Sequence, residues 1–166
     1  MVKWLQTSLF AVLFAASSAV GASHAQAQDP TKGEVIVILA KEAAGAVDPS
    51  LRPMAALRRA PFNAFRSMEV LSRPQLRLVP SQPSEVRLPN GRSLRVTLQQ
   101  VLPDGRYRVR VSINRNAQND YLPLLQVVAS PGDPFLVAGQ AHQGGTLVVA
   151  IRVGEPRAPA VAPPAP

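Results

Sequence analysis

Five arginines occupy positions from which they could bind an anion together. They are Arg87, Arg95, Arg106, Arg108 and Arg110. The last three alternate along one predicted strand, and alternate side chains of a strand share a face. Because guanidinium groups bind phosphates and carboxylates through paired hydrogen bonds, the sequence predicts a basic face that contacts an anionic partner. The alternative interpretation is a solvated sheet face that binds nothing, with Glu85 paired to Arg95 across two strands.

Catalytic chemistry has few candidate residues. His142 is the one histidine after residue 27, so a Ser–His–Asp arrangement would have to use it, and residues 140–145 are expected to form a polar hairpin loop. The acidic residues that could pair as acid and base lie mostly in predicted turns; they are Asp48, Glu69, Glu85, Asp104, Asp120 and Asp133. None has the spacing of a calcium loop. We therefore expect no catalytic residue, no cofactor and no metal site.

The chain of 166 residues has no cysteine, which excludes disulfides, thiolate metal sites and cysteine nucleophiles. Its formal charge is +8 and its isoelectric point is about 11.3. That charge is typical of nucleic-acid binding. However, no aromatic side chains interrupt the predicted basic face to stack on bases, so we expect no nucleic-acid partner.

Residues 1–27 have the pattern of a secretory signal peptide. Lys3 precedes an apolar stretch over residues 5–16, and Ala25-Gln26-Ala27 fits the site at which a signal peptidase cuts. The apolar stretch is shorter than the roughly 20 residues that a membrane span needs. Cleavage would remove Lys3 and no acidic residue, which lowers the formal charge from +8 to +7. The sequence predicts export to the periplasm or the cell exterior, with no membrane span in the processed chain.

The remaining chain is expected to form one β-rich domain over residues 34–153. Residues 34–40 (EVIVILA) predict a strand that is buried on both faces and central in its sheet. Further apolar runs, separated by Pro, Gly, Asn and Asp, predict an antiparallel β-sandwich or barrel-like domain. They cover residues 67–72, 75–79, 84–88, 93–102, 106–114, 121–129, 135–139 and 146–153.

One short helix is expected near residues 50–59. Ser50 fits its N-cap, and Pro61 ends it. Leu51, Met54 and either Leu57 or Arg58 fall at helical spacing and give a modest apolar stripe. Residues 28–33 are expected to be a flexible start. Residues 154–166 are rich in proline and alanine and are expected to be a disordered tail.

A repeated pentapeptide predicts the local strand register. Residues 88–92 (LPNGR) recur as residues 102–106 (LPDGR), and each fits a three-residue hairpin loop with glycine in the left-handed conformation. Two such loops make a three-stranded meander. Keeping every apolar residue on one side requires a β-bulge at Gln99-Gln100. The predicted pairs are Val86–Leu94, Val101–Tyr107, Leu98–Val109, Val96–Val111 and Leu94–Ile113.

Several segments resemble small exported proteins of Gram-negative proteobacteria that have no assigned activity. They are residues 48–51 (DPSL), 61–65 (PFNAF), 94–97 (LRVT) and 144–151 (GGTLVVAI). In addition, the hairpin at Asp104-Gly105, the turn at Pro131-Gly132 and the glycine-ended strand at Gly139 are similar to the β-rich core of secretins. The resemblance implies an exported β-rich domain and brings no functional residues.

Together these features predict an exported, soluble, non-enzymatic binding or accessory module of the cell envelope. Its partner would be an envelope protein or an anionic envelope component, held by the five arginines. Two alternatives remain open at this point. One is a small secreted hydrolase that uses His142 or a pair of carboxylates, and the other is a self-assembling structural envelope protein with a long exposed sheet edge.

Overall fold

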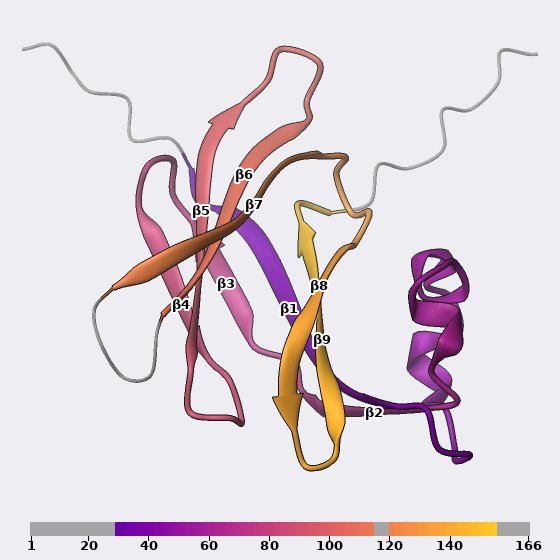
Figure 1. Ribbon diagram of the computed structural model, residues 1–166. Helices are drawn as coiled ribbons and strands as arrows, with labels where there is room; N and C mark the ends of the chain where they lie inside the picture. Colours follow the sequence, from indigo (N-terminus) through magenta and orange to yellow (C-terminus); the bar gives the residue numbers. More distant parts are fainter. Residues whose placement is uncertain (1–28, 115–119, 156–166) are drawn as a thin grey trace, which may run out of the picture.

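The computed structural model describes residues 29–114 and 120–155. Within them the chain forms nine strands and three short 3-10 turns (Figure 1). These elements are β1 (Thr31–Lys41), η1 (Pro49–Leu51), η2 (Ala55–Arg58), η3 (Phe62–Ala64), β2 (Ser67–Ser72), β3 (Gln75–Leu78), β4 (Pro83–Arg87), β5 (Ser93–Val101), β6 (Tyr107–Asn114), β7 (Tyr121–Ala129), β8 (Phe135–His142) and β9 (Gly145–Val153). The predicted signal peptide and almost all of the predicted tail lie outside the described residues. No helix in the described part of the chain is long and apolar enough to cross a membrane.

The strands form two antiparallel sheets that pack face to face, which confirms the predicted mainly β, sandwich-like fold. The first sheet has the order β2-β1-β9-β8, with β3 also pairing with β1, and the second has the order β4-β5-β6-β7. Alternate residues of both sheets fill the space between them. Val35, Val37 and Leu39 of β1 share this core with Leu94, Val96 and Leu98 of β5.

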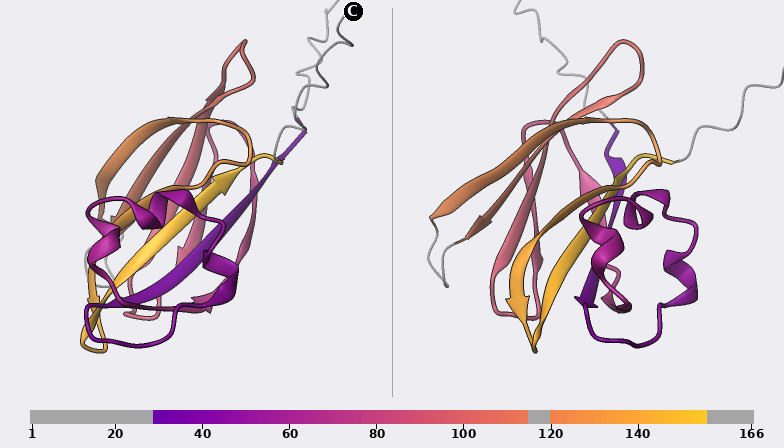
Figure 2. Two further views of the ribbon diagram at one scale, coloured as in Figure 1. Left: turned by 90° about the vertical axis from the view of Figure 1, so that its right-hand side faces the viewer. Right: turned by 45° about the vertical axis from the view of Figure 1, so that its right-hand side comes forward.

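A cap of 3-10 turns, residues 49–66, covers the other face of the first sheet (Figure 2). Ile36, Ile38 and Ala40 of β1 point to this side and form a second buried cluster with Leu51 and Leu57 of the cap. Strand β1 is therefore buried on both faces, as predicted for residues 34–40. Strand β9 lies between β1 and β8 and is buried on both faces for the same reason.

The meander follows the predicted register. Leu88 N–H donates to the carbonyl of Arg92 at 2.7 Å, and Leu102 N–H donates to that of Arg106 at 2.8 Å. The glycines of both loops, Gly91 and Gly105, have a φ of 81°. The predicted pairs are present, and the β5–β6 register shifts between Leu98 and Gln100 at the predicted bulge. Proline, an Asx residue and glycine at fixed spacing were sufficient to set this geometry.

The expected helix near residues 50–59 takes the form of two 3-10 turns instead. Leu51, Met54 and Leu57 are all buried, and their spacing of three is the period of a 3-10 helix, in which such side chains align on one face. Pro53 lies between the turns and offers no backbone donor. Asp48, rather than Ser50, is the N-cap: its Oδ1 accepts a hydrogen bond from Ser50 N–H at 2.8 Å.

Both ends of the domain extend beyond the predicted limits. The start expected to be flexible already belongs to β1 from Thr31, because Thr31, Lys32 and Gly33 pair with residues of β3. At the other end, Gly154 N–H donates to the carbonyl of Lys32 at 2.8 Å, and Lys32 forms an ion pair with Glu155. Residues 154–155, which were expected to belong to the tail, therefore form polar contacts with the first strand.

Candidate functional site

A groove of about 670 Å³ crosses the outer face of the second sheet. Its floor comes from β5 and β6, and its sides come from the start of β4 and from β7. The residues that line it are Ser81, Pro83, Arg95, Thr97, Arg110, Ser112, Tyr121, Pro123, Leu124, Leu125 and Gln126. Two of the five predicted arginines, Arg95 and Arg110, therefore share one cavity with several hydroxyl groups.

Strand alternation places these two arginines outward and side by side. Leu94, Val96, Val109 and Val111 are buried in the sandwich core, so the residues between them point to the opposite face. Thr97 pairs with Arg110 and Arg95 pairs with Ser112. The two arginines are thus diagonal neighbours on adjacent strands, within reach of a single ligand.

Arg95 is held in place by two partners. Its Nη2 lies 2.6 Å and its Nε 3.1 Å from Oε1 of Glu85, which confirms the predicted cross-strand pair. Its Cζ lies 3.5 Å from the ring centre of Tyr121, a close cation–π contact. The hydrogen bond from Arg95 lowers the pKa of the Glu85 carboxyl, so this carboxyl is ionised at neutral pH and balances much of the charge of Arg95.

Arg110 has no comparable partner. Its side chain is exposed, and it forms no hydrogen bond or ion pair with any other described residue. All of its guanidinium donors are therefore available to a ligand in the groove. The groove therefore contains the guanidinium of Arg95, whose orientation is fixed, and that of Arg110, whose charge no described acidic residue balances.

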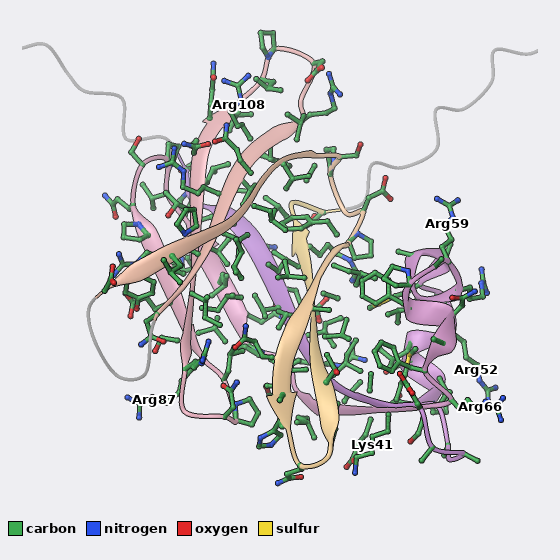
Figure 3. All side chains as sticks on the ribbon, in the orientation of Figure 1. Lys41, Arg52, Arg59, Arg66, Arg87 and Arg108 are labelled. Atoms are coloured by element: carbon green, nitrogen blue, oxygen red, sulfur yellow. The ribbon has the colours of Figure 1, made fainter. Side chains whose placement is uncertain are left out.

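The other three predicted arginines lie outside the groove. Arg106 precedes β6 in the second hairpin, where its Nη2 lies 2.7 Å from Oδ2 of Asp104 and lowers the pKa of that carboxyl. Arg108 faces outward on β6 and donates to Oε1 of Gln100 at 3.4 Å. Figure 3 shows Arg87 and Arg108 at opposite ends of the second sheet. Four of the five arginines are strand residues and Arg106 is a loop residue, so the five do not form one cluster.

The predicted catalytic candidates are dispersed. His142 lies at the end of β8, paired with Gly145, and not in a loop as expected. The turn is shorter than predicted because Gln143 and Gly144 both adopt positive φ, which closes a hairpin with two residues. Among the described residues, no three His, Cys, Asp or Glu side chains come together as a metal site would require.

Sequence reasoning missed the contribution of β7 to the groove. The contact of Tyr121 with Arg95 spans β6 and depends on the pairing of β6 with β7. That pairing shifts register between Val111 and Ser112. No repeated turn sequence marks this connection, so the position of Tyr121 had no local signal.

Comparison of the chain with protein-family models, with curated proteins and with solved structures gives no match.

Proposed function

We propose that this protein is an exported, non-enzymatic binding module of the cell envelope that holds an anionic group in the groove of the second sheet. The observation that supports this function is the diagonal pair of Arg95 and Arg110 on the groove floor. The export part of the proposal rests on the signal-peptide pattern of residues 1–27.

The chemistry of the groove suits a phosphate or carboxylate on a larger molecule. Arg110 offers paired donors to one anionic group, and the hydroxyls of Thr97 and Ser112 lie beside it on the same face. Pro83 and Leu124 give apolar contact at the sides. A groove across a sheet face leaves room for the rest of a polymer or of a protein surface.

Replacing both groove arginines, as Arg95→Gln with Arg110→Gln, is expected to weaken binding of anionic probes by at least about tenfold, because each lost charge-assisted hydrogen bond is worth more than a neutral one. The probes are poly-L-glutamate for carboxylates and tripolyphosphate for phosphates. Their affinities would be measured by titration calorimetry at low salt, since surface electrostatics weaken as salt rises.

The matched control removes the same charge from two arginines outside the groove, as Arg106→Gln with Arg108→Gln. This control is expected to retain affinity within about twofold, because neither residue lines the groove.

The variant Glu85→Gln should bind the probes more tightly than the original protein, because it removes the carboxylate that pairs with Arg95. Equal losses in the two double variants would show that the probes respond to net charge alone, and this result would contradict the groove as a site.

A second candidate function, self-assembly, is favoured by the edge strand β7. This strand lies at one end of the second sheet, and none of its nine residues is charged. Leu122, Leu124 and Val128 are 37%, 39% and 42% exposed. Natural proteins usually protect such edges with charges, because an unpaired apolar strand can pair with another chain.

Under this second candidate, sedimentation velocity should show a dimer whose fraction grows with protein concentration. Val128→Lys should shift that equilibrium toward monomer by about tenfold, because a lysine on an edge opposes strand pairing. Ala141→Lys, which adds the same charge to the exposed part of edge strand β8, should leave it unchanged. A monomer at all concentrations would rule out self-assembly through β7.

A further inference from the structure

A second cavity lies beneath the cap, on the far side of the first sheet from the groove. Its volume is about 500 Å³, within the range of small-molecule sites. Leu51, Leu57 and Phe65 of the cap and Met68 of β2 give it an apolar lining. Val47, Arg52 and Arg58, which also line it, are exposed, so the cavity opens to solvent.

The 3-10 geometry of the cap explains why space remains here. Leu51, Met54 and Leu57 form a ridge in the second buried cluster, and Leu51 and Leu57 also border the cavity. Phe62 and Phe65 are only partly buried against this cluster. Val47 meets β2 through a single bridge to Met68. Short turns of this kind cannot cover a sheet as continuously as a long helix, because their runs rarely exceed one turn.

Two arginines, Arg52 and Arg58, lie at the rim of the cavity. The cap, residues 49–66, contains Arg52, Arg58, Arg59 and Arg66 and no acidic residue. Nη1 of Arg58 donates to the carbonyl of Arg52 at 3.1 Å, which holds this guanidinium at the rim. The preceding acid, Asp48, accepts hydrogen bonds from N–H and Oγ of Ser50 and is not paired with either rim arginine. Figure 3 shows Arg52, Arg59 and Arg66 extending away from the sheets into solvent.

We propose that this cavity binds a single-chain anionic amphiphile, a fatty carboxylate, with its apolar chain inside and its head group at Arg52 and Arg58. The apolar lining accounts for the chain, because burying methylene groups is favourable without any directional contact. The basic rim accounts for the charge of the head group, since guanidinium binds carboxylate through paired hydrogen bonds. Arginine stems can lie along apolar surface while their charged ends move to meet the head group.

The chemistry of the ligand can be tested by titration calorimetry with three probes. Decanoate should bind with a negative heat-capacity change, the mark of apolar burial. Decanol has the same chain without the charge and should bind about tenfold more weakly, in proportion to a lost charge-assisted hydrogen bond. Acetate has the charge without the chain and should give no measurable binding. Failure of decanoate to bind, or acetate binding as tightly as decanoate, would overturn the proposal.

Variants locate the site. Arg52→Ser with Arg58→Ser should reduce decanoate affinity to that of decanol and leave decanol binding unchanged. Val47→Trp should block the cavity and abolish binding of both, whereas Val101→Trp, at a site of similar exposure on β5, should not. Decanoate binding that survives Val47→Trp would overturn the assignment. The groove variant Arg95→Gln with Arg110→Gln should bind decanoate normally, so failure of one site is distinguishable from failure of the other.

Discussion

Replacing Ile38 with alanine is expected to lower the free energy of unfolding by about 3 kcal/mol. Ile38 is in β1, is 0% exposed and belongs to the cluster between the first sheet and the cap. Its removal loses the transfer free energy of the buried carbons and leaves a cavity that a close-packed interior cannot fully close. Urea unfolding monitored by circular dichroism would measure the change, provided that the slope against urea stays constant.

Two further variants test whether the cap and the two sheets form three packed layers. Leu51→Ala, on the cap side of the same cluster, should cost a comparable amount. Val101→Ala, at a side chain that is 44% exposed, should change the stability by less than about 0.5 kcal/mol. If Ile38→Ala and Leu51→Ala both behaved like Val101→Ala, the cap would not be covering the first sheet.

The parts of the fold that could be predicted depend on local signals. The Leu-Pro-Asn-Gly-Arg and Leu-Pro-Asp-Gly-Arg loops bring neighbouring strands together, so alternation of Leu94, Val96 and Leu98 was enough to derive the β4–β5–β6 register. The pair of Arg95 with Glu85 follows from that register. A hairpin fixes its register through its own loop and needs no information from elsewhere in the chain.

The first sheet could not be derived in the same way. Its central pair joins β1 to β9, with Val35 opposite Ile151, and no turn connects the two strands. The uninterrupted apolar runs of both strands predicted that they are interior, but not which strand is next to which. The two-sided burial of β1 also implied that something covers its second face, without showing that three 3-10 turns do so and leave a cavity.

The groove was predictable only in part, because some of its residues are brought together by strand pairing that no local sequence signal specifies. Outward positions of Arg95 and Arg110 follow from alternation. The groove itself depends also on Pro83 and on residues of β7, which complete its lining. Arg106 also forms an ion pair with Asp104, which the sequence analysis had assigned to the turn of the second hairpin. A charge pattern therefore identifies the face of a sheet, and tertiary contacts decide which members of the pattern can act together.

Replacing Gly154 with alanine is expected to cost about 3 kcal/mol of unfolding free energy, from two sources. Gly154 has a φ of +72°, which is unfavourable for any residue with a Cβ. A Cβ there would also lie 2.7 Å from Cε2 and from Oη of Tyr107, whose ring packs against the main core. Thermal and urea unfolding would measure the loss.

Gly91 provides a matched control, because its φ is +81° and nothing lies within 4 Å of the position that an added Cβ would occupy. Gly91→Ala should therefore show the cost of the backbone conformation alone, about 1 kcal/mol. Equal losses at Gly91 and Gly154 would mean that the end of β9 does not close on Tyr107.

The contact itself can be isolated with a double-mutant cycle. Tyr107→Leu removes the ring that the new Cβ would meet, so the combination with Gly154→Ala should cost less than the sum of the two single changes. The expected coupling is about 1 to 2 kcal/mol, the overpacking part of the loss. Because Gly154 N–H also donates to Lys32, a coupling of this size would place the end of β9, the start of β1 and Tyr107 in one cooperative unit. Strict additivity would instead place residue 154 in the tail, as its sequence composition suggested.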